Sequence, residues 1–204
     1  NHIEAYLTYV LQRIDLKRDI HFYTNTTIDT LDYSGTGLNS GSKVVFAAYG
    51  DKRRELSTEV PSCLNGLHGF ENVKMIMPGI LALQAKPFSS YEAAVREMEM
   101  LNAQCRSFNE QLKGIALMII CDNAIFAGET LNNFLWVTFT RCNPSHDIYG
   151  VNSFTANKHW GCDGPLIIDA RIKPHHAPSL VKDMDVERKI DRLFEKGGSL
   201  YGII

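Results

Sequence analysis

The longest unbroken run of hydrophobic residues lies at 115–121 and ends in Asp122 and Asn123. A run without polar alternation is typical of a strand that is buried on both faces of a sheet. We therefore predict a central strand here, followed by a joining turn over 122–128. Open α/β sheets bind ligands at the carboxyl ends of their strands, so this turn is the first candidate for a site.

A helical pattern of hydrophobic residues follows the turn, over 131–142. Thr130 is placed to cap the start of this helix, and Pro144 ends it. The hydrophobic positions go most of the way around, so we expect the helix to pack on more than one neighbour, with Trp136 in the core.

The rest of the chain alternates between helical and strand patterns. Together these elements predict an α/β fold, close to α+β, in which helices flank a mixed and largely buried sheet. Ser89 and Glu92 form a capping box at the start of the longest helix. The other predicted helices cover 2–14, 51–64, 91–112 and 184–196. One or two short strands are predicted within 19–33, a strand pair or one strand broken at 77–79 over 73–85, and single strands over 43–49, 148–149 and 165–170. Irregular stretches cover 34–42, 150–164 and 174–178.

Composition narrows the class of protein. The chain has 204 residues, of which 45% are hydrophobic and 22% charged, as in an ordinary soluble globular domain. The net charge of −2 gives no reason to expect nucleic acid as a partner. No hydrophobic stretch reaches the ~20 residues of a membrane helix, and no signal peptide is visible. Five irregularly spaced cysteines indicate reduced thiols and a cytoplasmic location.

The chain starts without Met and already inside a helical pattern. We therefore expect a fragment of a longer protein. In this interpretation, residues 1–18 are a linker helix from an upstream domain, and residues 19–204 are the α/β domain itself.

Four residues are candidate metal ligands: Cys142, His146, His159 and Cys162. Their local spacings, C-x3-H and H-x2-C, could place thiolate and imidazole ligands for zinc on two loops. The alternative is that Cys142 is a small buried hydrophobe and that His146 caps a turn. The alternative is favoured, because such short motifs often occur by chance.

Three acids, Asp122, Asp147 and Asp169, lie at predicted strand ends, with Arg141 and Lys173 nearby in sequence. They could form a general acid/base set. Such residues more often form ion pairs that hold loops at strand ends. No nucleophile signature surrounds any serine or cysteine, so we assign no catalytic residue.

The central stretch resembles the C-terminal domain of the UbiD family of decarboxylases. That family has a hydrophobic strand ending in acids, a helix with a Trp, the run T-R-x-x-P-x-x-D and, about twenty residues later, D-A-T-x-K. The resemblance covers about residues 20–197. The corresponding residues here are Ile119–Asp122, Leu135–Trp136, Thr140–Asp147 (with Arg141, Pro144 and Asp147 at the motif positions) and Asp169–Lys173.

The sequence also departs from the family pattern. Asn123 and Ala124 stand where the family has further acids, and Arg171 stands at the position of its Thr. The loop 150–164 does not align with the family pattern.

The resemblance implies a role beside an active site. Family enzymes use prenylated FMN with a divalent metal and K⁺ to decarboxylate aromatic or α,β-unsaturated acids reversibly. The flavin and a Glu-Arg-Glu catalytic set lie in a split barrel that precedes this domain, and no position here matches that set. The chain is therefore expected to hold no cofactor, to pack on its own upstream flavin domain, to build a homo-oligomer and to help close the active site.

A second hypothesis comes from a different class of protein. The chain could be a self-contained binding domain that uses the 122–128 turn and the 150–164 loop, with or without a metal. Stoichiometric zinc in the purified protein would favour it over the decarboxylase hypothesis.

Overall fold

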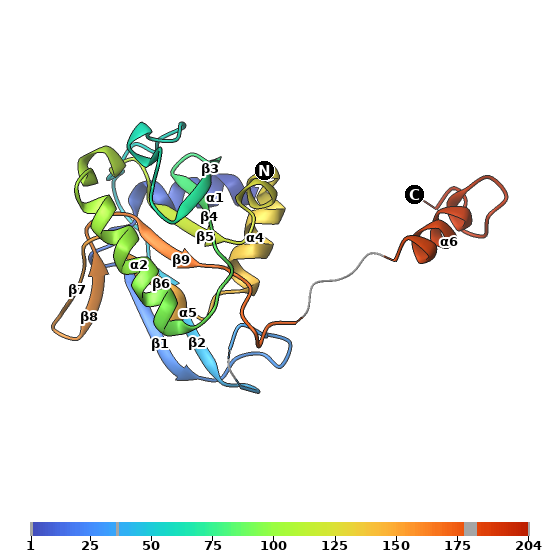
Figure 1. The fold of residues 1–204 in the computed structure, drawn as a ribbon, viewed down its shortest axis with the longest axis horizontal. Helices are drawn as coiled ribbons and strands as arrows, with labels where there is room; N and C mark the ends of the chain where they lie inside the picture. Colours follow the sequence, from blue (N-terminus) through green and yellow to red (C-terminus); the bar gives the residue numbers. More distant parts are fainter. Residues whose placement is uncertain (1, 36, 178–182, 204) are drawn as a thin grey trace.

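The computed structural model describes residues 2–35, 37–177 and 183–203. A five-stranded sheet lies at its centre (Figure 1). Its strands are β3 (Phe70–Met77), β4 (Ile80–Ala85), β5 (Leu117–Cys121), β6 (Ile148–Gly150) and β9 (Leu166–Asp169). The spatial order is β3-β4-β5-β9-β6; the three inner strands run parallel, and the two outer strands are antiparallel to their neighbours. The predicted α/β class with a mixed sheet is confirmed.

Strand β5 is buried along its whole length, as the unbroken hydrophobic run predicts. Alternate side chains of a strand point to opposite faces of a sheet. Leu117, Ile119 and Cys121 accordingly belong to one hydrophobic cluster, and Met118 and Ile120 to the other. The sheet therefore has two covered faces.

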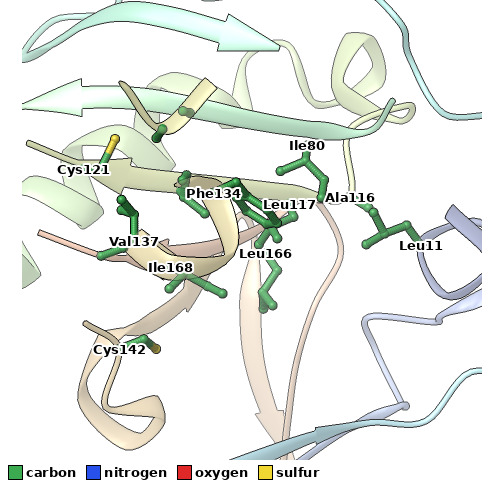
Figure 2. Packing of buried hydrophobic residues seen from close by; sticks show 14 of the residues in the cluster. Leu11, Ile80, Ala116, Leu117, Cys121, Phe134, Val137, Cys142, Leu166 and Ile168 are labelled. Atoms are coloured by element: carbon green, nitrogen blue, oxygen red, sulfur yellow. The ribbon is translucent and has the colours of Figure 1, made fainter. Parts of the chain in front are cut away.

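The first face is covered by α1 (His2–Arg13), α4 (Leu131–Thr140) and the antiparallel pair β1 (Ile20–Thr26) and β2 (Gly41–Phe46). Figure 2 shows Phe134 and Val137 of α4 beside the sheet, with Leu11 of α1 at the far end of the cluster. Leu11, Ile14 and Leu16 all lie in this cluster, so the residues before 19 pack on the same core as the sheet.

The second face is covered by α2 (Tyr91–Arg106) and by two short 3₁₀ turns, η1 (Ser62–Leu64) and η2 (Asn109–Leu112). The helix predicted over 91–112 is therefore divided, with Ser107 at the end of α2. Its N-cap is Ser90 rather than Ser89, since the Ser90 hydroxyl accepts the Ala93 N–H at 3.2 Å.

One predicted element is wrong. Residues 51–64 form no helix apart from η1, because their backbone bonds to distant parts of the chain. Arg53 N donates to Gln12 O at 2.8 Å, and Ser57 N donates to Gly114 O at 2.9 Å. By contrast, the one or two short strands predicted over 19–33 are confirmed as a single strand, β1.

The predicted loop 150–164 contains a hairpin of β7 (Ser153–Ala156) and β8 (His159–Cys162). Its two turn residues, Asn157 and Lys158, have φ values of 52° and 64°. Positive φ at both positions matches the twist of a two-residue hairpin. The sequence signal was missed because Asn-Lys is a weaker turn signature than Asn-Gly.

The C-terminal helix α6 (Met184–Phe194) confirms the prediction over 184–196 except for its last two residues. The Asp183 side chain caps its start. The helix lies apart from the sheet and its covering helices (Figure 1), and none of its residues is buried. The stretch predicted as extended over 174–178 ends in Pro178, which lies outside the described residues. Within the described ranges, no helix has both the length and the hydrophobicity of a membrane span.

Candidate functional site

The parallel pairing of β5 and β9 brings two acids to the same edge of the sheet. Ile120 lies opposite Asp169, which is the last residue of β9. Asp122 follows β5 directly, before the short helix α3 (Ala124–Glu129). The turn predicted over 122–128 is therefore mostly helical, with Asn123 as its N-cap. The carboxyl edge of the sheet is the place where charged side chains gather.

Asp169 and Arg171 form a fully buried ion pair at this edge. The Arg171 Nε donates to Asp169 Oδ1 at 2.9 Å, and Nη2 donates to Oδ2 at 2.7 Å. The Arg171 Nη1 reaches Glu97 of α2 at 2.7 Å and the Lys86 carbonyl at 3.0 Å. Burial alone would lower the pKa of Arg171, but these bonds raise it above its ordinary value. The guanidinium therefore joins β9 to α2 as a permanent cation.

Lys173 and Asp147 form a second buried pair. The Lys173 Nζ lies 3.2 Å from Asp147 Oδ1 and donates to the carbonyls of Asp169 at 2.6 Å and Arg141 at 3.0 Å. Asp147 Oδ2 accepts the Asn143 N–H at 2.7 Å. Burial raises the pKa of Asp147 to about 6, although the neighbouring Lys173 charge opposes that shift.

Arg141 and Asp122 form a third, partly exposed pair with an Nη1–Oδ2 distance of 3.4 Å. Asp122 Oδ2 also accepts the Ile172 N–H at 2.8 Å. The Arg141 guanidinium lies 4.9 Å from the centre of the Trp136 ring. Burial lowers the pKa of Arg141, yet the nearby carboxylate keeps it a cation. The pair joins the end of α4 to the segment after β9.

Pro144 begins a one-turn helix, α5 (Pro144–Asp147), where a proline loses no helical hydrogen bond. The Ser42 hydroxyl of β2 donates to Asn143 Oδ1 at 2.5 Å and accepts the Ser145 N–H at 2.8 Å. These bonds hold the 143–147 segment, and with it Asp147, against the β1–β2 pair.

His176 lies next to the Lys173 pair. Its Nδ1 accepts the Lys173 N–H at 3.1 Å, whereas its Nε2 is buried without a hydrogen-bond partner. Burial and the Lys173 charge lower the pKa of His176 to about 4. The imidazole is therefore neutral at physiological pH.

The four candidate metal ligands are not brought together, and none belongs to a group of described residues that could hold a metal ion. Cys142 and Cys162 lie in the hydrophobic core of the first face, where burial raises the pKa of each thiol. His146 contacts the Ser145 hydroxyl at 2.8 Å, and the His159 ring packs against His21. The structure therefore gives the metal version of the second hypothesis no support, because the described candidate ligands do not gather at one place and both cysteines pack in an apolar core.

The prediction that Trp136 is a core residue is also wrong. Its side chain is 53% exposed, whereas Phe134 on the same helix is 0% exposed. Trp136 lines an open cavity of about 690 Å³ beside the ion pairs, together with Arg141 and His176. We call this cavity the aromatic groove. Its other hydrophobic lining residues include Leu31, Tyr33, Phe126, Phe139 and Ile172.

Sequence reasoning missed Arg171 and Glu97 as members of the buried network. Arg171 stands out in the sequence only as a departure from the family motif. The two-residue spacing between Asp169 and Arg171 at a strand end was a usable signal, because such neighbours can pair around the strand end. Glu97 carried no signal, since it lies 74 residues away in the sequence.

Comparisons with known proteins confirm the resemblance found in the residues. The family model described as the 3-octaprenyl-4-hydroxybenzoate carboxy-lyase C-terminal domain, UbiD_C, matches residues 1–48. A Chlamydia pneumoniae protein, named as one of the subunits of 4-hydroxybenzoate decarboxylase, is 30% identical over 183 residues, which cover 89% of this chain and 29% of that protein. An uncharacterised protein of Chlamydia caviae is 27% identical over 181 residues, with the same coverage. The chain thus spans less than a third of the length of these relatives.

Solved structures of UbiD-class enzymes show a weaker likeness. A dimeric form of HmfF from Pelotomaculum thermopropionicum, in complex with prFMN, has a TM-score of 0.38 and 16% identity, covering 61% of this chain and 26% of that one. Vanillic acid decarboxylase from Sedimentibacter hydroxybenzoicus, in an open form, gives the same TM-score and identity, covering 65% and 30%. At these TM-scores the likeness carries no structural argument.

Proposed function

We propose that this chain is the C-terminal domain of a UbiD-like decarboxylase, in which it builds the oligomer and packs against the flavin domain that carries out the chemistry. The full-length enzyme would decarboxylate aromatic or α,β-unsaturated acids reversibly with prenylated FMN, a divalent metal and K⁺. Its location would be the cytoplasm.

One observation carries this proposal. The Chlamydia pneumoniae relative, whose name assigns it to 4-hydroxybenzoate decarboxylase, matches 89% of this chain, while the match takes up only 29% of the relative. Most of that relative therefore lies outside the matched part, which leaves room for a separate catalytic domain. The match of residues 1–48 to a C-terminal domain family supports the same assignment.

The buried charges support a structural role for the carboxyl edge of the sheet. Arg171 joins β9 to α2 through Asp169 and Glu97, and Lys173 joins β9 to the 141–147 segment. A bidentate arginine–carboxylate pair fixes geometry even where it adds little net stability. These pairs make the edge stiff, as a surface that packs against a second domain requires.

The cations at the carboxyl edge of the sheet already have partners within the chain. Arg171 and Lys173 are buried and saturated by carboxylates and carbonyls, and Arg141 faces Asp122. A second, polar cavity of about 420 Å³ is lined by further cations, which include Lys17 and Arg53. Lys17 pairs with Asp163, and Arg53 with Asp15. Together with the family resemblance, these pairings favour the other domain of the proposed enzyme as the place of its flavin and metals.

The test compares three purified proteins: the longer polypeptide that contains this chain, the same polypeptide without residues 19–204, and the chain alone. Each is assayed for CO₂ release from 4-hydroxybenzoate with prenylated FMN, and its mass is measured by light scattering. We expect the longer polypeptide to be an active oligomer. The deletion should lower both the number of polypeptides in each assembly, which is the measured mass divided by the polypeptide mass, and the rate of CO₂ release. A deletion that leaves the assembly and the rate unchanged would contradict the proposed role.

A further inference from the structure

The cavity of about 420 Å³ lies at the end of the sheet where the parallel strands β5 and β9 begin. Ile115 and Pro165, which precede these strands, form part of its wall. Lys17 reaches it from the α1–β1 connection, Arg54 from the segment after β2, and Asn109 from η2. Separate parts of the chain therefore meet around one space, which we call the polar cavity.

Arg54 is a cation of this cavity that has no acidic partner among the described residues. Its backbone N–H donates to Gln12 O at 3.2 Å, and its Nη1 donates to Leu11 O at 2.6 Å, so the end of α1 fixes its position. An arginine has five N–H donors in a planar fork that fits two oxygens of one anion. Within the described chain, Nε and Nη2 of Arg54 donate to no other group, and this side of the fork is available to a ligand.

The partial burial of Arg54 increases what an anion would contribute there. Burial lowers the pKa of Arg54, and the charge of Asp15 opposes that shift only in part. The guanidinium nevertheless stays a cation, because its ordinary pKa lies far above neutral pH. Opposite charges attract more strongly where water is partly excluded. A bound anion would therefore offset the cost that burial places on this charge.

Three further cations, Lys17, Arg53 and Lys113, line the polar cavity, and each pairs with one carboxylate of its wall. With Arg54, four cations meet three carboxylates, which leaves one excess positive charge. The side chains of these three cations are 48–71% exposed. Exposed ion pairs contribute little to stability, so these side chains can turn toward an anion bound on Arg54.

Asn109 adds a group that lacks a partner. Its Oδ1 is buried without a hydrogen bond among the described residues, although the side chain lines the polar cavity. An acceptor that is buried without a donor is unfavourable. The last side-chain torsion of asparagine is broad, so a small rotation can turn Oδ1 toward a donor in the cavity. A ligand with a hydroxyl group beside its anion would supply that donor.

We propose that the polar cavity binds a small phosphate ester, with the phosphate on the Arg54 fork and a hydroxyl group of the ligand on Asn109. The carbon skeleton would lie against Leu112, Ile115 and Pro165. This site goes beyond the proposed function and does not depend on it.

The size and charge of the polar cavity favour a phosphate ester over a simple carboxylate. Small-molecule sites have volumes of about 300–1,000 Å³, so a cavity of about 420 Å³ can hold more than a bare anion. A phosphate brings two charges and three terminal oxygens. Two of these oxygens can accept from Arg54 while the third faces Lys17 or Arg53, whereas a carboxylate has only the oxygens for the fork.

Isothermal titration calorimetry of the full 204-residue chain, in buffer without phosphate, tests the site with three probes. The probes are inorganic phosphate, glycerol 3-phosphate and glycerate, which carries a carboxylate on a similar hydroxylated skeleton. We expect one glycerol 3-phosphate per chain, bound about 5-fold more tightly than inorganic phosphate because of the added hydrogen bond. Glycerate should bind at least about 10-fold more weakly than glycerol 3-phosphate.

Variants locate the binding. Arg54→Gln should weaken glycerol 3-phosphate binding by about 10- to 100-fold, because hydrogen bonds to a charged group are lost. Lys52→Gln is the matched control: it removes the same charge two residues away, outside the cavity wall, and should change the affinity by less than about 3-fold. Asn109→Ala should abolish the advantage of glycerol 3-phosphate over inorganic phosphate and leave the affinity for phosphate itself unchanged.

Circular dichroism checks that each variant is folded. Lys17→Gln takes the place of Arg54→Gln if the latter does not fold, because the Lys17 side chain is 55% exposed, and it should weaken binding by about 5-fold.

Three results would overturn the proposal. The first is a wild-type chain that binds neither phosphate probe at 10-fold the concentration of a millimolar site. The second is an affinity that the cavity variants and Lys52→Gln change equally, which would place the anion elsewhere. The third is glycerate binding as tight as that of glycerol 3-phosphate, which would make the cavity a carboxylate site.

Discussion

At the scale of single residues, the edge of the sheet depends on charges that are removed from water. Asp147, Asp169, Arg171 and Lys173 are each 0–1% exposed. Removing an ion from water costs several kcal/mol, and its partner and hydrogen bonds must offset that cost. Each of these groups has such partners, so the network adds little net stability but penalises any arrangement that separates the charges.

Lys173→Met should therefore destabilise the chain by about 3–5 kcal/mol, because it leaves the Asp147 carboxylate buried without its cation. Urea denaturation near neutral pH measures the change. Lys52→Met is the control, since Lys52 pairs with Glu55 on the surface and its loss should change the unfolding free energy by less than about 1 kcal/mol. Equal effects of the two substitutions would show that the buried pair has no special role.

The pH dependence of stability should report the Asp147 carboxyl. Its pKa is raised from 3.8 to about 6, so the folded state binds this proton more tightly than the unfolded state does. Its contribution to stability is then fully present below pH ~4 and is lost as the pH rises through about 6. The stability of the wild type relative to Asp147→Asn should fall by about 3 kcal/mol between those limits.

His176 provides a control of opposite sign. Its pKa is lowered from 6.5 to about 4, so its contribution is present above pH ~6.5 and is lost as the pH falls through about 4. The stability of the wild type relative to His176→Asn should therefore rise with pH over the same range. If the stability of the wild type relative to Asp147→Asn and relative to His176→Asn changed with pH in the same direction, the environments assigned to these two side chains would be contradicted.

At the scale of elements, helix α4 has one hydrophobic face that is buried and one that is exposed. Phe134, Val137 and Thr138 are buried against the sheet, whereas Trp136 and Phe139 point to the aromatic groove. The sequence pattern predicts the helix and its Thr130 cap, and the Thr130 hydroxyl does accept the Asn133 N–H at 3.0 Å. The pattern could not show which hydrophobic face is covered within the chain, because an exposed hydrophobic face has the same composition as a core face.

Phe134→Ala should destabilise the chain by about 3–5 kcal/mol, because the ring is fully buried and its loss leaves a cavity. Trp136→Ala on the same helix should cost less than about 1 kcal/mol in a monomeric sample, since its ring is half exposed before the substitution. Chemical denaturation at low protein concentration compares the two. A larger loss of unfolding free energy for Trp136→Ala than for Phe134→Ala would contradict the exposed position of the Trp136 ring.

A local sequence pattern also does not show tertiary contacts, which explains the elements that the sequence did not predict. Residues 51–64 carry a helical pattern, but their backbone groups bond to Gln12 and Gly114 instead. Tertiary contacts of this kind override local propensity. The central strand was predictable because the run of seven hydrophobic residues at 115–121 that contains it leaves few alternatives. The β7–β8 hairpin was not, because both of its strands carry polar residues.

At the scale of the whole molecule, the chain consists of a sheet covered on both faces and of the C-terminal helix α6, which has no buried residue. The sheet, its two covering layers and the buried ion pairs form one stiff body, and α6 lies apart from that body (Figure 1). The fold class followed from the alternation of strands and helices. The candidate site followed only in part. Asp147, Asp169 and Lys173 were predicted members of it, whereas Arg171, which pairs with Asp169, and Glu97, which pairs with Arg171, were not.

The central claim is that this chain shapes an active site that lies in another domain. The most direct test is the flavin absorbance, per mole of protein, of the chain purified from cells that make prenylated FMN. We predict no flavin band for the chain alone, while the longer polypeptide purified in parallel retains one. A stoichiometric flavin band from the chain alone would contradict the account.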